Sequence, residues 1–244
     1  MKFNLWSSGL GEIGQAFTIA FGLVVSLDSN LMEIVLLSLK VSLSAMVIAC
    51  VLGFGLGAAL ASLKFPGRKA IIVVINALMG LPPVVVGLVV YLLLSRSGPL
   101  GVLGLLYTPT AMVIAQVVLI TPLVAALCLQ VLQDLHHEYD EFFRSLRLRP
   151  LDKIKTLLWD ARFSLITVGL AGFGRAISEV GAVMIVGGNI NHVTRIMTTA
   201  IALETSKGTL ALALALGITL ITISVAINTI AMLVGSSAKR RAYA

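Results

Sequence analysis

Charged residues are scarce in this sequence of 244 residues: 12% are charged, whereas 58% are hydrophobic. A soluble globular domain usually carries about 25% charged residues. Half of that fraction leaves too little polar surface to keep a folded chain in water, so lipid is the expected solvent. In hydrocarbon every backbone N–H needs an internal partner, and long apolar segments meet this need as helices. The composition therefore predicts an all-α integral membrane protein.

Groups that could support catalysis or bind a metal are also scarce. The two cysteines, Cys50 and Cys128, lie in apolar runs without a neighbouring His or acid, and are expected to pack as small hydrophobes. Adjacent residues on a helix point about 100° apart, so His136 and His137 cannot share a metal well. The chain has no Ser-His-acid arrangement and no Gly-x-x-x-x-Gly-Lys-[Ser/Thr] phosphate loop. We expect no catalytic site, metal or cofactor in this chain, and ATP would have to be hydrolysed by another polypeptide.

Basic residues outnumber acidic ones, 18 to 11, but they lie in loops between apolar runs. No basic-aromatic stripe suggests a platform for bases, so nucleic acid is not an expected partner. Lys and Arg concentrate on the cytoplasmic side of membrane proteins. Twelve of the 18 fall in three segments that alternate spans would place on one side, around residues 64–69, 144–162 and 239–241. The expected location is the inner (plasma) membrane, multi-pass, with the N-terminus outside and the C-terminus cytoplasmic.

Long apolar stretches set the number of spans, since about 20 apolar residues are needed to cross a bilayer. Five stretches qualify: 41–62, 70–95, 109–133, 163–187 and 208–238. The first helix is expected to begin near Leu31, because Asn30 and Glu33 have the spacing of a capping box. Residues 13–27 are shorter and suit an interfacial helix, with a sixth span as the alternative. We therefore divide the chain into an N-terminal interfacial segment (1–30), a transmembrane domain (31–238) and a basic tail (239–244).

Two features inside the spans predict close packing and bending. Gly53, Gly55 and Gly57 would let another backbone approach the first span. Pro82 and Pro83 must break or kink the second span, because proline removes a backbone donor and clashes with the preceding turn. Simple packing and a gate are both open interpretations of this break.

The longest polar segment, 134–162, joins the third and fourth spans. Its apolar residues recur at spacings of three and four and predict a short amphipathic helix, from about 140 to 148, ended by a proline. They are Tyr139, Phe142, Phe143 and Leu146. Such a helix is suited to docking in a groove of a partner, although it could also pack on its own spans.

This segment resembles the coupling loop of bacterial ABC importer permeases, whose pattern is Glu-Ala-Ala, three variable residues, Gly and a later Ile-x-Leu-Pro. The pattern places its acidic residue at Glu141. The alanines become Phe142 and Phe143, the glycine becomes Arg147, and Leu-Pro becomes Trp159-Asp160. The resemblance implies that this helix couples to an ATPase, with Phe142 and Phe143 as anchors and Arg144 and Arg147 as polar contacts beside Glu141 and Leu146.

A second resemblance covers roughly residues 31–238. GFGRAISEVGAVMIVGGNI (172–190) and TRIMTTAIALETSKG (194–208) closely resemble tungstate transporter permeases. FPGRK (65–69) and LPPVVVGLVVYLLLSRSGPLG (81–101) are similar to the molybdate type. The resemblance implies the type I ABC importer permease fold, a homodimer, a separate ATP-binding ABC subunit and an extracytoplasmic binding protein that delivers the oxyanion. A permease for molybdate or another oxyanion is the alternative, and a stand-alone secondary carrier is a second one.

Arg175 and Glu179 are the two ionisable residues within the fourth span. They lie one helical turn apart, so their side chains can meet. Ionisable groups inside a span are costly and are often functional, but a buried pair can also lock two helices. A structural lock and a role in the pathway or gate, with Pro82 and Pro83, are both retained.

The segment after the fourth span is expected to lie outside the membrane. Gly187, Gly188 and Asn189 predict a turn. The polar residues that follow are expected to face the outside: Thr194, Arg195, Thr198, Thr199, Glu204 and Lys207. Arg195 is either a solvated charge or a contact for a binding protein.

Overall fold

The computed structural model describes residues 16–26, 28–146 and 148–242, apart from the side chains of 144, 231 and 234–242. Every regular element within these ranges is a helix. A short helix, Ala16–Val25, precedes α2. The elements that follow are α2 (Ser29–Ser62), α3 (Arg68–Met79), α4 (Pro83–Leu94), η1 (Gly101–Leu103), α5 (Pro109–Ser145), α6 (Pro150–Asp160), α7 (Arg162–Ile177), α8 (Gly181–Gly187), α9 (Met197–Lys207) and α10 (Leu210–Ala242).

Three of the helices are long and apolar enough to cross a membrane alone, namely Ser29–Ser62, Pro109–Phe143 and Leu210–Ile230. Two further spans result if each bent pair counts as one: α3 with α4, bent by 104°, and α7 with α8, bent by 56°. The expectation of an all-α membrane protein with about five spans is confirmed. The described part of the first helix, Ala16–Val25, is shorter than a span.

The central contact of the fold joins α2 to α5. A Cβ on Gly53 would lie 2.7 Å from Cγ1 of Val124, and one on Gly57 would lie 2.7 Å from the carbonyl oxygen of Ala125. These glycines, one helical turn apart, therefore let the two backbones approach closely, as predicted. Gly55 faces open space. Cys128, fully buried, packs beside Gly57, which suits a cysteine used as a small hydrophobe.

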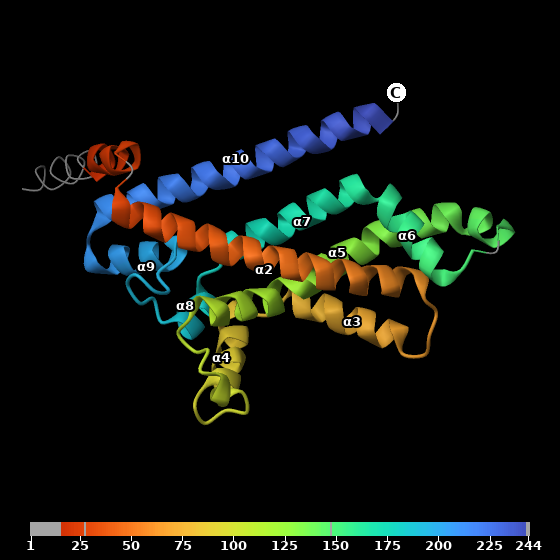
Figure 1. Ribbon diagram of the computed structural model, residues 1–244, viewed down its shortest axis with the longest axis horizontal. Helices are drawn as coiled ribbons and strands as arrows, with labels where there is room; N and C mark the ends of the chain where they lie inside the picture. The colour runs from red at the N-terminus through yellow and green to blue at the C-terminus, as the bar shows by residue number, and fades with distance from the viewer. Residues whose placement is uncertain (1–15, 27, 147, 243–244) are drawn as a thin grey trace, which may run out of the picture.

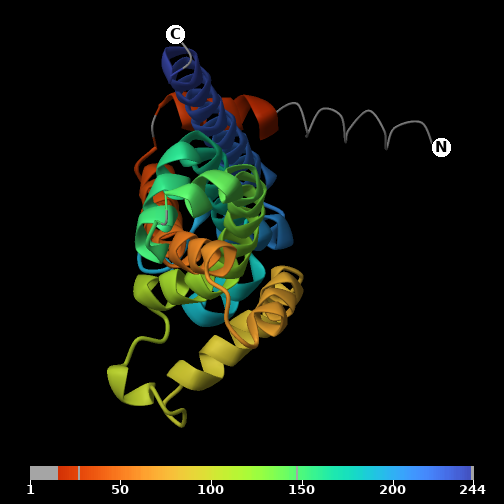
Figure 2. The ribbon, with the colours of Figure 1, turned by 90° about the vertical axis from the view of Figure 1, so that its right-hand side faces the viewer.

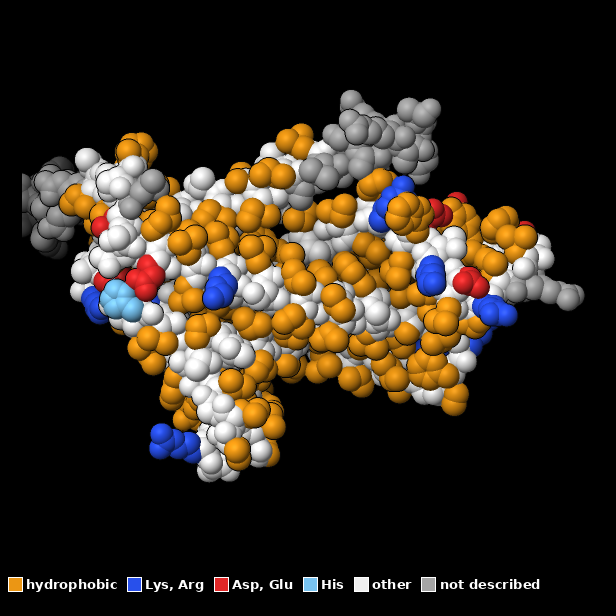
Figure 3. Space-filling view, in the orientation of Figure 1, with side chains coloured by type: hydrophobic (Ala, Val, Ile, Leu, Met, Phe, Trp, Pro, Cys, Tyr) orange, Lys and Arg blue, Asp and Glu red, His pale blue; other side chains and the backbone are white. Residues whose placement is uncertain are grey.

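The long helices run side by side, and α4 projects away from them (Figures 1 and 2). The α2–α3 turn, the α5–α6 turn and the C-terminal end of α10 lie towards one end of the molecule, and α9 lies towards the other. Most charged side chains gather towards the two ends of the molecule. Hydrophobic side chains cover the stretch between them (Figure 3). This distribution matches a bilayer-spanning body with two wet ends.

The start of α2 differs from the prediction. The helix begins at Ser29, and its cap is Asp28, whose carboxylate accepts hydrogen bonds from the backbone N–H groups of Asn30 and Leu31. The predicted capping box of Asn30 and Glu33 is therefore wrong. An aspartate is an equally good cap, and it leaves Glu33 free to reach another segment.

Candidate functional site

Two broken helices meet within the bundle. The first break lies between α3 and α4, where Gly80 caps α3 and Pro82 and Pro83 open α4. Proline suits the first turn of a helix, because the N–H that it lacks would have no intrahelical partner there. The backbone N–H groups of Val85 and Val86 turn back to the carbonyl oxygen of Pro82. The sequence prediction of a break at Pro82 and Pro83 is confirmed.

The second break, between α7 and α8, packs against the first. A Cβ on Gly87 would lie 2.7 Å from Cα of Ala182, and one on Gly181 would lie 2.9 Å from Cγ2 of Val84. A glycine on each side thus allows α4 and α8 to touch almost backbone to backbone. The sequence did not predict this break, since the fourth span was expected to continue to residue 187.

Glu179 occupies the second break and connects three helices. Its side chain is 5% exposed. One carboxylate oxygen accepts a hydrogen bond from the N–H of Ala182 at 3.2 Å and so caps α8. The backbone carbonyl oxygen of Glu179 accepts a hydrogen bond from Oγ1 of Thr198, on α9, at 2.8 Å. A buried carboxylate with these partners holds the break in one arrangement.

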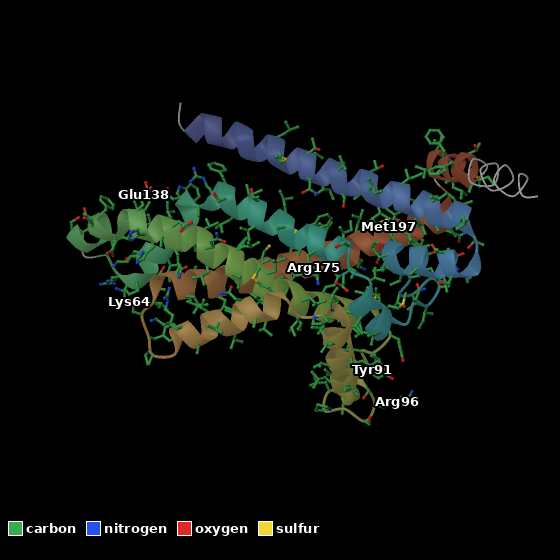
Figure 4. All side chains as sticks on the ribbon, turned by 180° about the vertical axis from the view of Figure 1, so that it is seen from behind. Lys64, Tyr91, Arg96, Glu138, Arg175 and Met197 are labelled. Carbon is green, nitrogen blue, oxygen red and sulfur yellow. The ribbon has the colours of Figure 1, made fainter. Side chains whose placement is uncertain are left out.

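Arg175 and Glu179 face each other as predicted. An Nη of Arg175 lies 3.8 Å from Oε2 of Glu179, and the arginine side chain is 39% exposed. Arg175 lies about midway along the molecule (Figure 4). Its loose pairing leaves donors of the guanidinium available, so a positive group is presented beside the break.

Three polar residues support this region, of which the sequence analysis overlooked two and expected the third to face outside. Gln116, fully buried on α5, donates from Nε2 to the carbonyl oxygen of Ala176 at 3.0 Å. Ser38 on α2 accepts a hydrogen bond from the N–H of Met197, at the start of α9, at 2.7 Å. Thr198 is the third. A lone amide in an otherwise apolar run was the available signal for Gln116, because an unsatisfied polar group in hydrocarbon is costly.

The predicted coupling helix is not a separate element. α5 continues without a break to Ser145, so residues 134–145 form its last turns. Pro150 does not end a helix but opens α6 at its first position. The expectation of a distinct short helix at about 140–148 is wrong, because helical propensity carries α5 through a polar stretch that no glycine or proline interrupts.

The predicted anchors separate into a buried one and an exposed one. Phe142 and Leu146 are 57% and 53% exposed, and Glu141 is exposed. Phe143 is fully buried, with its ring centroid 5.8 Å from that of Tyr139, so it packs on its own fold and cannot be a surface anchor in this conformation. The side chains of Arg144 and Arg147 lie outside the described residues.

The polar segment 134–162 ends where the sequence predicted, although the Leu-Pro that closes the family pattern is absent. Trp159 and Asp160 close α6, and α7 begins at Arg162. The guanidinium carbon of Arg162 lies 4.7 Å from the ring centroid of Trp159 and 4.4 Å from that of Phe163. Stacking of this kind stabilises the corner that a proline would otherwise fix.

The segment at the opposite end is more buried than predicted. The turn is confirmed, since α8 ends at Gly187 and Gly188 adopts φ +70°. The expectation that the following polar residues face outside is wrong for the four that are buried, which are Thr194, Thr198, Thr199 and Glu204. Their burial follows from the packing of α9 onto the bundle. Nδ1 of His192 in this segment lies 2.7 Å from Oε2 of Glu33, on α2.

Comparison with known proteins defines the class. Residues 51–240 match the family described as binding-protein-dependent transport system inner membrane component. The match covers more than half of the chain, so the chain belongs to this family of ABC importer permeases.

The relatives of the chain include named uptake systems. It is 41% identical over 218 residues to the tungstate uptake system permease protein TupB of Peptoclostridium acidaminophilum, covering 89% of this chain and 96% of that protein. It is 40% identical to TupB of Campylobacter jejuni, over 68% of this chain and 70% of that protein. A probable anion ABC transporter permease protein of Haloferax volcanii is 38% identical, over 82% of this chain and 88% of that protein. The resemblance to tungstate permeases seen in the sequence is confirmed.

Proposed function

We propose that this chain is the membrane-spanning permease subunit of an ATP-driven oxyanion importer, with tungstate as the substrate. The observation that carries the proposal is the 41% identity to a tungstate permease across 96% of that relative. Two copies of the chain form the pathway, a binding protein delivers the anion from outside, and a separate ATP-binding subunit drives the cycle. Molybdate or another oxyanion is the alternative substrate, because tetrahedral dianions of similar size present the same chemistry.

The orientation follows from charge. The α2–α3 turn, the α5–α6 segment and the C-terminal tail hold twelve of the 18 basic residues and face the cytoplasm, so the N-terminus lies outside. The ATP-binding subunit docks on the exposed apolar side chains of the α5–α6 segment, with Phe142 on α5, Leu146 just after its end and Trp159 on α6. Closure of the ATP-binding subunits is thereby passed to α5 as a rigid-body motion.

The pathway passes the two broken helices. Arg175 offers a transient partner for a dianion, while Glu179 holds the joint between α7 and α8. Broken helices are tolerated at membrane depth where they line a cavity, which supports placing the gate at Pro82, Pro83, Arg175 and Glu179. Any conformational change that separates α4 from α8 would open the contact between the two broken helices.

Uptake into proteoliposomes tests the proposal. Vesicles holding the chain and its co-purified ATP-hydrolysing subunit should accumulate tungstate only when ATP and the binding protein are both supplied. Accumulation without nucleotide or partner would instead identify a secondary carrier. Preferential accumulation of molybdate or sulfate would keep the permease class and change the substrate.

A further inference from the structure

A basic pocket lies where the turn after α2 meets the last turns of α5, next to residues 141–160, on which the ATP-binding subunit is proposed to dock (the docking segment). Its volume is about 280 Å³. Its polar lining consists of Lys64, Arg68, Gln133, His136, His137 and Asp140. None of these residues belongs to the broken-helix contact, and the proposed transport mechanism makes no use of them.

Positive charge dominates this pocket. Lys64 and Arg68 on the pocket wall, and Lys153 from α6, all act electrostatically on His136, and Asp140 is the carboxylate that opposes them. Three cations against one carboxylate give a positive field in a partly enclosed space, where charge interactions are stronger than in open water. An anion is the complementary occupant.

One cation of the pocket is held in place, and one polar atom of its lining lacks a partner. Arg68 is fixed by a hydrogen bond from Nε to the carbonyl oxygen of Leu60 at 2.6 Å, which ties its guanidinium to the end of α2. Nδ1 of His136 is buried and has no hydrogen-bond partner among the described residues. A buried polar atom without a partner destabilises the fold, so a ligand that supplied one would be bound more tightly.

The position of the pocket at the end of a span suits a lipid phosphate. Lys64 stands between Leu63 and Phe65, which are 37% and 38% exposed and directly follow the end of α2 at Ser62. Apolar side chains beside a cation at the end of a span are typical of the membrane interface. Lys64 lies at the same end of the molecule as Glu138 of α5, far from Arg96 (Figure 4). Basic pockets between spans on the cytoplasmic side bind anionic headgroups.

We propose that this pocket binds a phosphate-like tetrahedral oxyanion, held by Lys64 and Arg68 as charge partners and by His136 and Gln133 as hydrogen-bond donors. The group is either the headgroup phosphate of an anionic lipid or a free oxyanion from the cytoplasm. Occupancy would fasten the α2–α3 turn to the end of α5 beside the docking segment.

Two measurements on the full-length chain distinguish the two sources. In the first, delipidated protein in detergent is titrated calorimetrically with inorganic phosphate, sulfate and tungstate. In the second, native mass spectrometry counts phosphatidylglycerol retained after extraction from vesicles that also contain phosphatidylcholine. Binding in the first identifies a free anion, and retention of phosphatidylglycerol over phosphatidylcholine identifies a lipid.

Lys64→Gln is the test variant, and Lys69→Gln is its matched control. Both lysines are exposed, so neither change threatens folding, but only Lys64 lines the pocket. One cation near a headgroup contributes about 1 kcal/mol, so Lys64→Gln should weaken binding about fivefold, and Lys69→Gln distinctly less. Equal losses in the two variants, or binding in neither measurement, would overturn the proposal. Uptake by the transporter is read separately, so failure here leaves the proposed function standing.

Discussion

At the residue scale, Arg175 and Glu179 differ in burial, and the difference assigns them different tasks. The acid is nearly buried and caps α8, so it is tied to the fold, whereas the arginine is more than one-third exposed. An ionisable side chain within a span is costly, and one ion pair at 3.8 Å compensates this arginine only in part. The proposed contact with a transported anion would account for its position beside a broken helix.

Arg175→Gln should lower the uptake rate several-fold and leave thermal unfolding and co-purification of the ATP-binding subunit unchanged. The variant removes the positive charge but keeps a hydrogen-bonding side chain. Uptake into proteoliposomes measures the effect. Lys69→Gln is the control, since Lys69 is an exposed cation at the start of α3, next to the α2–α3 turn at the far end of the bundle. Equal uptake by Arg175→Gln and the parent chain would remove Arg175 from the pathway.

Glu204 gives a prediction that depends on pH. A hydrogen bond from the hydroxyl of Thr209 is the main cause that lowers the pKa of Glu204, with Lys207 and Arg195 adding to it, while burial acts against it. A carboxyl with a lowered pKa in the folded state contributes stability above its ordinary pKa, and this stability is lost as the pH falls through the lowered value. Thr209→Val should therefore cost about 1 kcal/mol at neutral pH and less below about pH 4. Thermal unfolding in detergent across pH measures this, and a cost independent of pH would contradict it.

At the element scale, the sequence predicted helices better than their ends and contacts. The spans, the break at Pro82 and Pro83 and the turn at Gly188 carry local signals, since proline and glycine act on their own backbone. The break after Ile177 lacks such a signal at residues 178–180 and depends on Glu179 capping α8, a contact that forms only in the folded chain.

Burial in the docking segment and in α9 was harder to predict for the same reason. Phe142 and Phe143 are neighbours of identical chemistry, yet one is exposed and the other buried, because α6 covers only one side of α5. Thr198 and Thr199 look like loop residues until α9 packs on the bundle. Only tertiary structure decides such cases.

Phe142 and Phe143 provide a matched pair for testing. Phe143→Ala should lower the free energy of unfolding by about 3–5 kcal/mol, because it leaves a cavity in the core. Phe142→Ala should change stability little but reduce the amount of ATP-binding subunit that co-purifies, since an exposed aromatic ring is lost from the docking face. Unfolding midpoints and pull-down yields measure the two effects. Full co-purification by a folded Phe142→Ala variant would argue against docking at this face.

At the scale of the whole molecule, the three basic segments lie towards one end, as spans that alternate in direction require (Figure 1). The basic side follows from sequence alone, because charge counting needs no coordinates. The sideways course of α4 was not predictable, since a proline indicates that a helix bends but not by how much.

Labelling of single cysteines in intact cells tests this orientation. In a chain with Cys50 and Cys128 replaced by Ala, a cysteine at Asn191 should react with an impermeant maleimide added outside. A cysteine at Lys153 should react only after the membrane is permeabilised. The reverse pattern would place the docking segment outside the cell and end the proposed mechanism.

The uninterrupted course of α5 has a mechanical consequence. Its 37 residues, with Pro122 inside them, extend about 55 Å along the helix path, so one continuous helix reaches from the docking segment past the broken helices. The two ends of such a helix keep a fixed rotational phase. One alanine inserted in the middle of α5 would turn everything beyond it by about 100° and misalign the proposed docking segment with the proposed gate. The same insertion in the turn before Pro150 would be absorbed by the turn. The rotational register of α5 thus links the two sites that the proposed function places at its ends.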